Sequence, residues 1–407
     1  MTPSLSFRQR IRQILRREVI GICLVVFMAD TANGIISPTF SLYAKSLGAS
    51  LALIGTLSAV VGLTRIVTAV PIGGLSDARG RKNVLSAGMV LFALSSLLYA
   101  FISDPLWLFP ARIVAGLAAV STFYIGVAYV GDVVAKNERG MAIGLYTTSM
   151  GIGFAIGPAI GGFVAANAGY QASFEIAAVI ALSGFIVTRV LLTEPTRAQE
   201  PRPANATPFV VKLKLLARDP NLLAASLANM LMSEVFGGVI VNFFPLYAAS
   251  LAIGDAMIGY MFSLRTFTSA AARLPTGLLT VRFSSRILML ASLSLAMLMA
   301  LAISFATEPL FLMIFLAGEG LAFGMFLTSG QAFITEHSSA SERGTAMAVY
   351  STAGGIGATV GPLLLGVIAE TWGLIAVFRF TAILVFVGVG ALWYISTRTH
   401  VMSVSET

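Results

Sequence analysis

Apolar segments of about 20 or more residues recur along the whole of this 407-residue chain, and they constrain its fold more than any other feature. A helix of about 20 residues crosses a hydrocarbon core about 30 Å thick. Helices satisfy their own backbone hydrogen bonds in lipid, which an open sheet does not. Only 11% of the residues are charged, against roughly 25% in a soluble domain. The sequence therefore predicts an all-α membrane protein that crosses the lipid bilayer.

Twelve such segments can be recognised, each flanked by polar or charged residues. The predicted spanning helices cover 18–43, 51–75, 83–102, 106–130, 140–166, 172–193, 220–250, 256–280, 287–306, 309–333, 345–369 and 374–396. The domains that follow are an N-terminal amphipathic segment at 1–17, a six-helix bundle at 18–193, a linker at 194–219, a second six-helix bundle at 220–396 and a tail at 397–407.

The net charge of +8 predicts orientation in the membrane. Of the 26 Lys and Arg residues, 19 fall in the N-terminal segment, the tail and the loops on the same side as these ends, and only Lys45 falls in a loop on the other side. Basic loops stay in the cytoplasm. We therefore expect both termini and the linker to be cytoplasmic in a bacterial inner membrane, and we expect no binding of nucleic acid.

The chain repeats itself at an offset of 204 residues. From 138 to 162, 12 of 25 residues are identical to those 204 positions later, and residues 40–47 match 244–251 at six of eight positions in the same register. Two bundles with the same orientation, related by a pseudo-twofold axis, follow from this parallel repeat. Such repeats place a solute path between the halves, near the middle of the membrane.

The junction of the second and third predicted helices carries a motif of glycines and charges: Gly73, Asp77, Gly80, Arg81 and Lys82. It resembles the signature loop of the major facilitator superfamily, although Ala78 stands where that family usually has arginine. The resemblance implies that this loop latches the halves together in the outward-facing state, with Asp77 at the start of the eleventh helix. A second family motif is carried only by Arg112 and Gly116.

The fifth predicted helix is rich in small residues and contains a proline: Gly153, Gly157, Pro158, Gly161 and Gly162. Small residues let helices approach closely in lipid. The pattern resembles the motif of the twelve-helix drug:proton antiporters within the same superfamily. The resemblance implies proton-coupled efflux of amphiphilic small molecules by alternating access.

Six charged residues lie deep in the predicted helices, where a charge costs at least about 2.5–3.5 kcal/mol and usually has a role. They are Asp30, Arg65, Arg112, Glu234, Arg265 and Glu319. The family's arrangement puts four of them, Asp30, Arg112, Glu234 and Glu319, on helices that line the cavity.

Asp30 and Glu234 are mates of the repeat, so we expect them at symmetric positions on the first and seventh helices. Arg112 is a plausible ion-pair partner for Asp30. Glu234 and Glu319 have no basic residue within one helical turn in sequence, which favours them as carriers of the proton, the expected coupling ion. Arg65 and Arg265 either pair with these acids or bind an anionic substrate.

Other functions are less compatible with the sequence. It contains no nucleophile–base set, no metal-ligand cluster, no phosphate-binding glycine loop and no nucleotide-binding domain. We therefore expect neither an enzyme, nor a cofactor, nor use of ATP, and we expect a monomer with a small-molecule substrate. A carrier of a metabolite such as an organic anion is the alternative within transport, and a receptor or scaffold is the alternative outside it.

Overall fold

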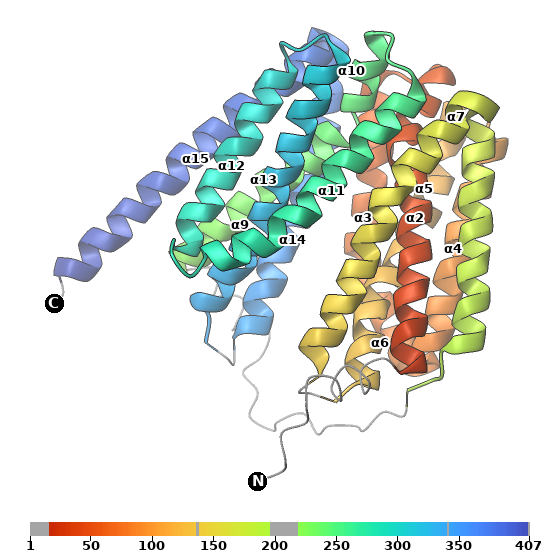
Figure 1. The fold of residues 1–407 in the computed structure, drawn as a ribbon, viewed down its shortest axis with the longest axis horizontal. Coiled ribbons are helices and arrows are strands. Elements are labelled where there is room, and N and C mark those ends of the chain that lie inside the picture. Colours follow the sequence, from red (N-terminus) through yellow and green to blue (C-terminus); the bar gives the residue numbers. More distant parts are fainter. Residues whose placement is uncertain (1–15, 136–137, 196–218, 340–341, 406–407) are drawn as a thin grey trace. The chain divides into compact units, whose positions relative to one another are not determined.

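The computed structural model describes residues 16–135, 138–195, 219–339 and 342–405, with side chains up to residue 393. The described chain is helical from end to end (Figure 1). Its first sequence half contains α2 (Arg17–Ser46), α3 (Leu51–Arg79), α4 (Arg81–Phe101), η1 (Pro105–Trp107), α5 (Leu108–Ala119), η2 (Val120–Tyr124), α6 (Ile125–Val133) and α7 (Arg139–Leu191). The second half contains α9 (Pro220–Ser233), η3 (Glu234–Ile240), α10 (Phe244–Ser250), α11 (Asp255–Leu279), α12 (Ser285–Ile303), α13 (Pro309–Glu336), α14 (Arg343–Trp372) and α15 (Leu374–Ser405).

These elements form the twelve predicted membrane helices. Within the described residues, ten helices are long and apolar enough to span a membrane. One of the ten, α7, is two helices joined at Gly169, whose φ of 85° breaks the helical path. The twelfth is α11, which is absent from the ten because Arg265, Arg273 and several hydroxyl side chains lower its hydropathy.

Several boundaries differ from the prediction. The expected loop between the second and third helices is reduced to Gly80, because α3 continues to Arg79 and α4 begins at Arg81. Gly80 makes this possible with a φ of 94°, a value that side chains rarely tolerate. The last helix continues to Ser405 instead of ending at 396, since no Gly or Pro stops it there. The predicted arm at 1–15 and the linker at 196–218 lie outside the described residues.

By packing, the chain divides into two compact units. Unit 1 comprises Met1–Tyr43, Leu63–Glu200 and Asp255–Ser263, and unit 2 comprises Ala44–Gly62, Pro201–Gly254 and Leu264–Thr407. These units follow the two predicted bundles except that each takes a short segment from the other sequence half. The two segments, 44–62 and 255–263, are mates of the repeat, because they include the first part of α3 and the first part of α11.

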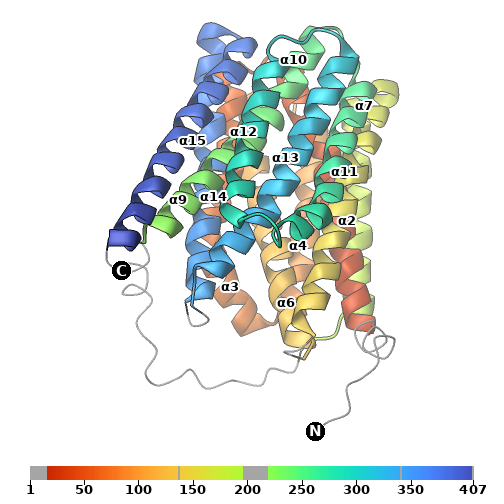
Figure 2. The same cartoon turned by 60° about the vertical axis from the view of Figure 1, so that its left-hand side comes forward.

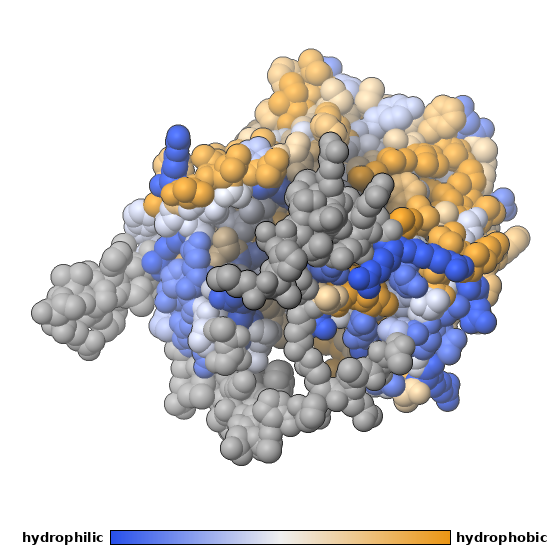
Figure 3. Space-filling model, turned by 60° about the horizontal axis from the view of Figure 1, so that its bottom comes forward, coloured by the Kyte–Doolittle hydropathy of each residue, from blue (hydrophilic) through white to orange (hydrophobic). Residues whose placement is uncertain are grey.

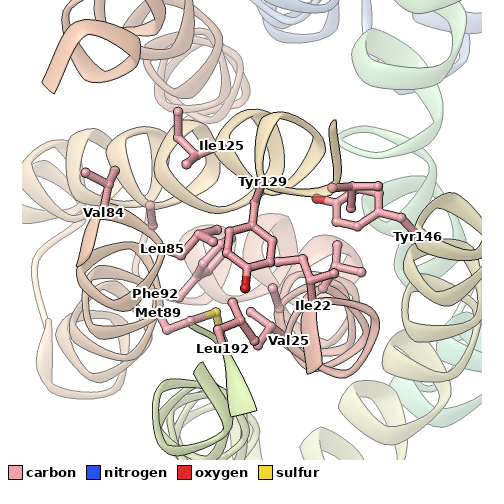
Figure 4. Packing of buried hydrophobic residues seen from close by; sticks show 14 of the residues in the cluster. Ile22, Val25, Val84, Leu85, Met89, Phe92, Ile125, Tyr129, Tyr146 and Leu192 are labelled. Carbon is pink, nitrogen blue, oxygen red and sulfur yellow. The ribbon is translucent and has the colours of Figure 1, made fainter. Parts of the chain in front are cut away.

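Each unit is held by side-chain packing between helices that lie alongside one another (Figure 2). In unit 1, Tyr129 of α6 lies among Val25 of α2, Met89 of α4 and Leu192 at the end of α7 (Figure 4). Its hydroxyl donates to the carbonyl of Thr193 at 2.9 Å, so the one polar atom of this side chain is satisfied. Aliphatic and aromatic contacts of this kind fix the helices on which the charged side chains stand.

The surface of the protein is unusually apolar for a folded chain. Side chains such as Val70, Phe101 and Val281 are 83%, 79% and 85% exposed. Figure 3 shows broad orange areas of such residues beside the blue, hydrophilic ones. Large exposed apolar areas mark membrane or protein contacts. Lipid is the solvent that suits these helices.

Candidate functional site

The charged residues predicted inside the membrane divide between the two units. Asp30, Arg65 and Arg112 belong to unit 1, and Glu234, Arg265 and Glu319 belong to unit 2. Within unit 1 the three residues form one electrostatic group, whereas in unit 2 Arg265 and Glu319 form a pair and Glu234 has other neighbours.

In unit 1, Asp30 of α2 is 7% exposed and accepts a hydrogen bond from Nδ2 of Asn33 at 3.1 Å. The cation in electrostatic range of this carboxylate is Arg65, from the middle of α3. The sequence favours Arg112 as the partner of Asp30, because helix position alone does not show which of two arginines points to an acid.

Arg112 of α5 makes a different contact. Its guanidinium carbon lies 3.8 Å from the centre of the Phe40 ring, a cation–π geometry. Phe40 is buried on α2, next to the equally buried Tyr99 of α4, with 5.4 Å between ring centres. Arg112 also lies within electrostatic range of Arg65, so the group in unit 1 contains two neighbouring cations.

In unit 2, Arg265 of α11 and Glu319 of α13 form a bidentate ion pair. Nε and Nη2 of the arginine donate to the two carboxylate oxygens at 2.6 and 3.1 Å. The two side chains are 2% and 0% exposed. Phe236 and Phe323 cover the guanidinium, with ring centres at 4.1 and 4.8 Å from its carbon. A planar guanidinium is well matched to a carboxylate in this geometry. Both carboxylate oxygens of Glu319 are thus bonded to Arg265, and aromatic rings cover the guanidinium, so the pair has little access to other partners.

Glu234 has very different surroundings from Glu319. Its Oε1 accepts a hydrogen bond from the hydroxyl of Thr381 on α15 at 3.0 Å. Its Oε2 is buried and has no hydrogen-bond partner among the described residues. The side chain packs on Gly361 of α14, where an added Cβ would lie 2.8 Å from Cγ of Glu234. Glu234 also begins the π-helical turn η3, a feature frequent at functional sites.

Glu234 and Glu319 are equivalent candidates by sequence, but they have different partners in the structure. Arg265 reaches Glu319 from another helix, which a search within one helical turn cannot detect. Thr381 and Phe323 were not identified from the sequence either. The one sequence feature that could have indicated Thr381 is its hydroxyl group within an apolar stretch of α15.

The ionic groups do not follow the repeat beyond Asp30 and Glu234. The positions 204 residues before Arg265 and Glu319 hold Val61 and Ala115. The positions 204 residues after Arg65 and Arg112 hold Ser269 and Leu316. The two halves therefore share their helices and carry different chemistry.

The glycine and charge motif forms a compact ionic junction between α3 and α4. Arg81 pairs with Asp77 at 2.9 Å and with Asp132 of α6 at 3.1 Å. The carboxylate of Glu194, just beyond α7, accepts from the backbone N–H groups of Arg81 and Lys82 at 2.5 and 3.0 Å. It thereby caps the N-terminus of α4, where an anion is favoured. These contacts explain why the motif combines glycine with charges of both signs.

The fifth predicted helix is the first part of α7, and its small residues contact other helices on two faces. On one face, a Cβ added at Gly153, Gly157 or Gly161 would come closer than 3.0 Å to the backbone of α2. On the other, Pro158 and Gly162 meet α11, where a Cβ on Gly259 would overlap the carbonyl of Pro158. Their repeat mates make the corresponding contact in unit 2, since Gly55 of α3 meets Pro362 and Gly366 of α14. Small residues are needed wherever helix backbones touch in this way.

Comparison with known proteins identifies relatives over the whole chain. An uncharacterized MFS-type transporter of Methanocaldococcus jannaschii is 24% identical over 385 residues, covering 94% of this chain and 98% of the relative. Multidrug resistance protein 2 of Bacillus subtilis is 29% identical over 191 residues, or 46% of this chain and 48% of that protein. Quinolone resistance protein NorA of Staphylococcus aureus is 25% identical over 45% of this chain. The chain thus matches about half the length of the two drug-resistance proteins.

Solved structures share the fold at low sequence identity. A bacterial homolog of the human lysosomal transporter Spinster, in an inward-facing and unoccupied conformation, aligns with a TM-score of 0.81 at 13% identity over 98% of both chains. The nucleoside transporter NupG, as a mutant, aligns with a TM-score of 0.77 at 17% identity over 93% of this chain and 99% of its own. The family model of the Major Facilitator Superfamily matches residues 22–250 and 230–406. The chain therefore belongs to the Major Facilitator Superfamily and is a multi-pass membrane transporter of small molecules, not an enzyme.

Proposed function

We propose that the protein is a secondary transporter that exports amphiphilic, drug-like molecules from the cell in exchange for protons. We place it in the cytoplasmic membrane of a bacterial cell, as a monomer with both termini in the cytoplasm. Its membership of the transporter family and its similarity to two drug-resistance proteins over half their length support this proposal.

Glu234 is the observation on which the proton coupling rests. The residue is 6% exposed, and the one described hydrogen bond of its carboxyl group comes from the neutral hydroxyl of Thr381. An unpaired carboxylate is costly away from water, whereas the protonated acid is tolerated. A carboxyl group of this kind holds a proton while it is enclosed and releases it when water or a cation reaches it. Glu319 is less suited to this role, because both of its carboxylate oxygens accept hydrogen bonds from Arg265.

Asp30 is the second candidate for a proton carrier. It differs from Glu234 because Arg65 lies near it and Asn33 donates to it. Movement of Arg65 away from Asp30 during transport would change the affinity of this carboxylate for a proton. A cycle that uses both acids would carry one proton site in each repeat.

Reconstitution of the purified protein into liposomes with an internal pH dye tests the proposal. In the wild type, addition of a transported amphiphile should drive a proton flux in the direction opposite to the movement of the amphiphile. Glu234→Gln should still bind the amphiphile, since glutamine has the shape of the protonated acid and keeps an oxygen for Thr381, but the proton flux should disappear. Thr381→Val is the matched control, because it removes the hydroxyl and leaves the carboxyl group in place. A normal proton flux in Glu234→Gln would exclude Glu234 as the carrier.

A further inference from the structure

Arg65 is a membrane-embedded cation with an incomplete set of partners. Its Nε is buried and has no hydrogen-bond partner among the described residues. An unsatisfied buried donor is costly, and more so when it is charged. Such a group calls for an acceptor that the described chain does not supply at this nitrogen.

Arg265 shows what a satisfied arginine looks like in the same protein. Both of its donors to Glu319 lie within 3.1 Å of an oxygen, and the side chain is 2% exposed. Arg65 has neither a bidentate partner nor complete burial, since it belongs to the half-buried residues of α3. The structure therefore distinguishes the two arginines, although their sequence contexts left both open as anion sites.

The charges around Arg65 add up to an excess of positive charge. Arg65 lies in electrostatic range of Arg112 and of one carboxylate, Asp30. Oδ1 of Asp30 is already engaged by the amide of Asn33. Arg65 thus has one neighbouring cation and one neighbouring carboxylate, which leaves a net positive charge inside an apolar unit, and a low-dielectric environment strengthens its attraction for an anion.

Aromatic side chains border the same group. Tyr124 lies in electrostatic range of Arg65 and is 54% exposed. It ends the π-helical turn η2, which interrupts the helix formed by α5 and α6. Phe40 lies under Arg112 at 3.8 Å. A ligand bound to Arg65 would thus have the exposed aromatic surface of Tyr124 nearby.

We propose that Arg65, supported by Arg112 and bordered by Tyr124, binds an oxyanion on the amphiphilic substrate, such as a carboxylate attached to an apolar body. This inference rests on the proposed function and narrows its substrate class. Arginine suits the task because its planar fork donates two parallel hydrogen bonds to an oxyanion. The incoming anion supplies the acceptor for Nε and offsets the excess charge.

Equilibrium binding in detergent, with no proton gradient, tests this site. The probes are dansyl-aminoundecanoic acid and its carboxamide, which share one apolar body and differ in charge, with fluorescence as the readout. The wild type should bind the acid about 10- to 100-fold more tightly than the amide, the range for hydrogen bonds to a charged group. Arg65→Gln should remove this preference and leave the affinity for the amide unchanged. Arg65→Lys keeps the positive charge but loses the planar guanidinium group, so this variant should retain part of the preference for the acid.

Arg273→Gln is the matched control. Arg273 also has a buried Nε without a hydrogen-bond partner in the described part of the chain, but it lies near the end of α11 and belongs to unit 2. This variant should keep the preference for the acid. Inorganic phosphate should not displace the probe if the site recognises the charged end of an amphiphile, whereas displacement by phosphate alone would indicate a site for small free anions and overturn the proposal.

Two further results would also overturn it: an equal preference for the acid in the wild type and in Arg65→Gln, or loss of that preference in Arg273→Gln alone. Because this assay measures the preference for an anionic probe and not the release of protons, its failure would leave proton coupling through Glu234 unaffected. Conversely, loss of coupling in liposomes would leave the binding preference intact.

Discussion

The buried pair of Arg265 and Glu319 allows a quantitative prediction for Glu319→Gln. The substitution leaves Arg265, which is 1% exposed, without its anionic partner. Removal of one member of a buried ion pair costs about 3–5 kcal/mol. For a unit of this size, 1 kcal/mol lowers Tm by about 2–4 °C. The apparent Tm of the variant should therefore fall by roughly 6–20 °C.

Thermal unfolding of the purified protein in detergent, followed by size-exclusion chromatography with fluorescence detection, measures this change. Glu234→Gln is the matched control, because its carboxyl group accepts from Thr381 and the amide oxygen can do the same. Its Tm should change by much less. The double variant Arg265→Met, Glu319→Leu should recover most of the loss, since both charges are gone. A Tm for Glu319→Gln equal to that of the wild type would refute the interpretation of a closed, structural pair.

Four other predictions follow from particular contacts. Gly80→Ala should lower the apparent Tm, because the φ of 94° suits glycine and an added Cβ would lie 2.6 Å from the carboxylate of Glu194. Asp77→Asn should reduce transport in liposomes more than substrate binding, and an equal reduction of both would exclude a role in conformational change. Glu370→Gln should speed hydrogen exchange at the amide of Leu51, which donates to Glu370 at 2.6 Å, and unchanged exchange would show that this cap is not formed in the membrane. A cysteine in the 194–219 linker should react with an impermeant maleimide only in inside-out vesicles, and labelling of intact cells would contradict the predicted topology.

The fold was predictable because its signals are local or periodic. Segment length gave the spanning helices, and the 204-residue repeat gave two halves of six. The predicted helix boundaries were wrong where local backbone geometry decides where a helix begins or ends. Gly80 joins two helices without a loop, and the polar end of α15 remains helical to Ser405.

The charged residues of the candidate site were conspicuous in the sequence, because any charge in an apolar helix stands out. Their pairing was predictable only as a set of alternatives. Their partners depend on rotation of one helix against another, which the sequence does not specify. Arg265 selects Glu319 from α13, Thr381 reaches Glu234 from α15, and Arg65 lies near Asp30 where Arg112 had been expected. The same limit applies to the fifth-helix motif, whose division into two packing faces appears only when α2 and α11 are in place.

Substrate-induced proton release is the measurement that tests proton coupling through Glu234 most directly. The purified protein in weakly buffered detergent solution, with a pH-sensitive dye, is mixed with a transported amphiphile near neutral pH. The wild type should release protons in proportion to the substrate bound, and Glu234→Gln should bind the same amphiphile with release reduced or abolished. Undiminished proton release from Glu234→Gln would contradict the account, and the proton would then have to be carried by Asp30 or not at all.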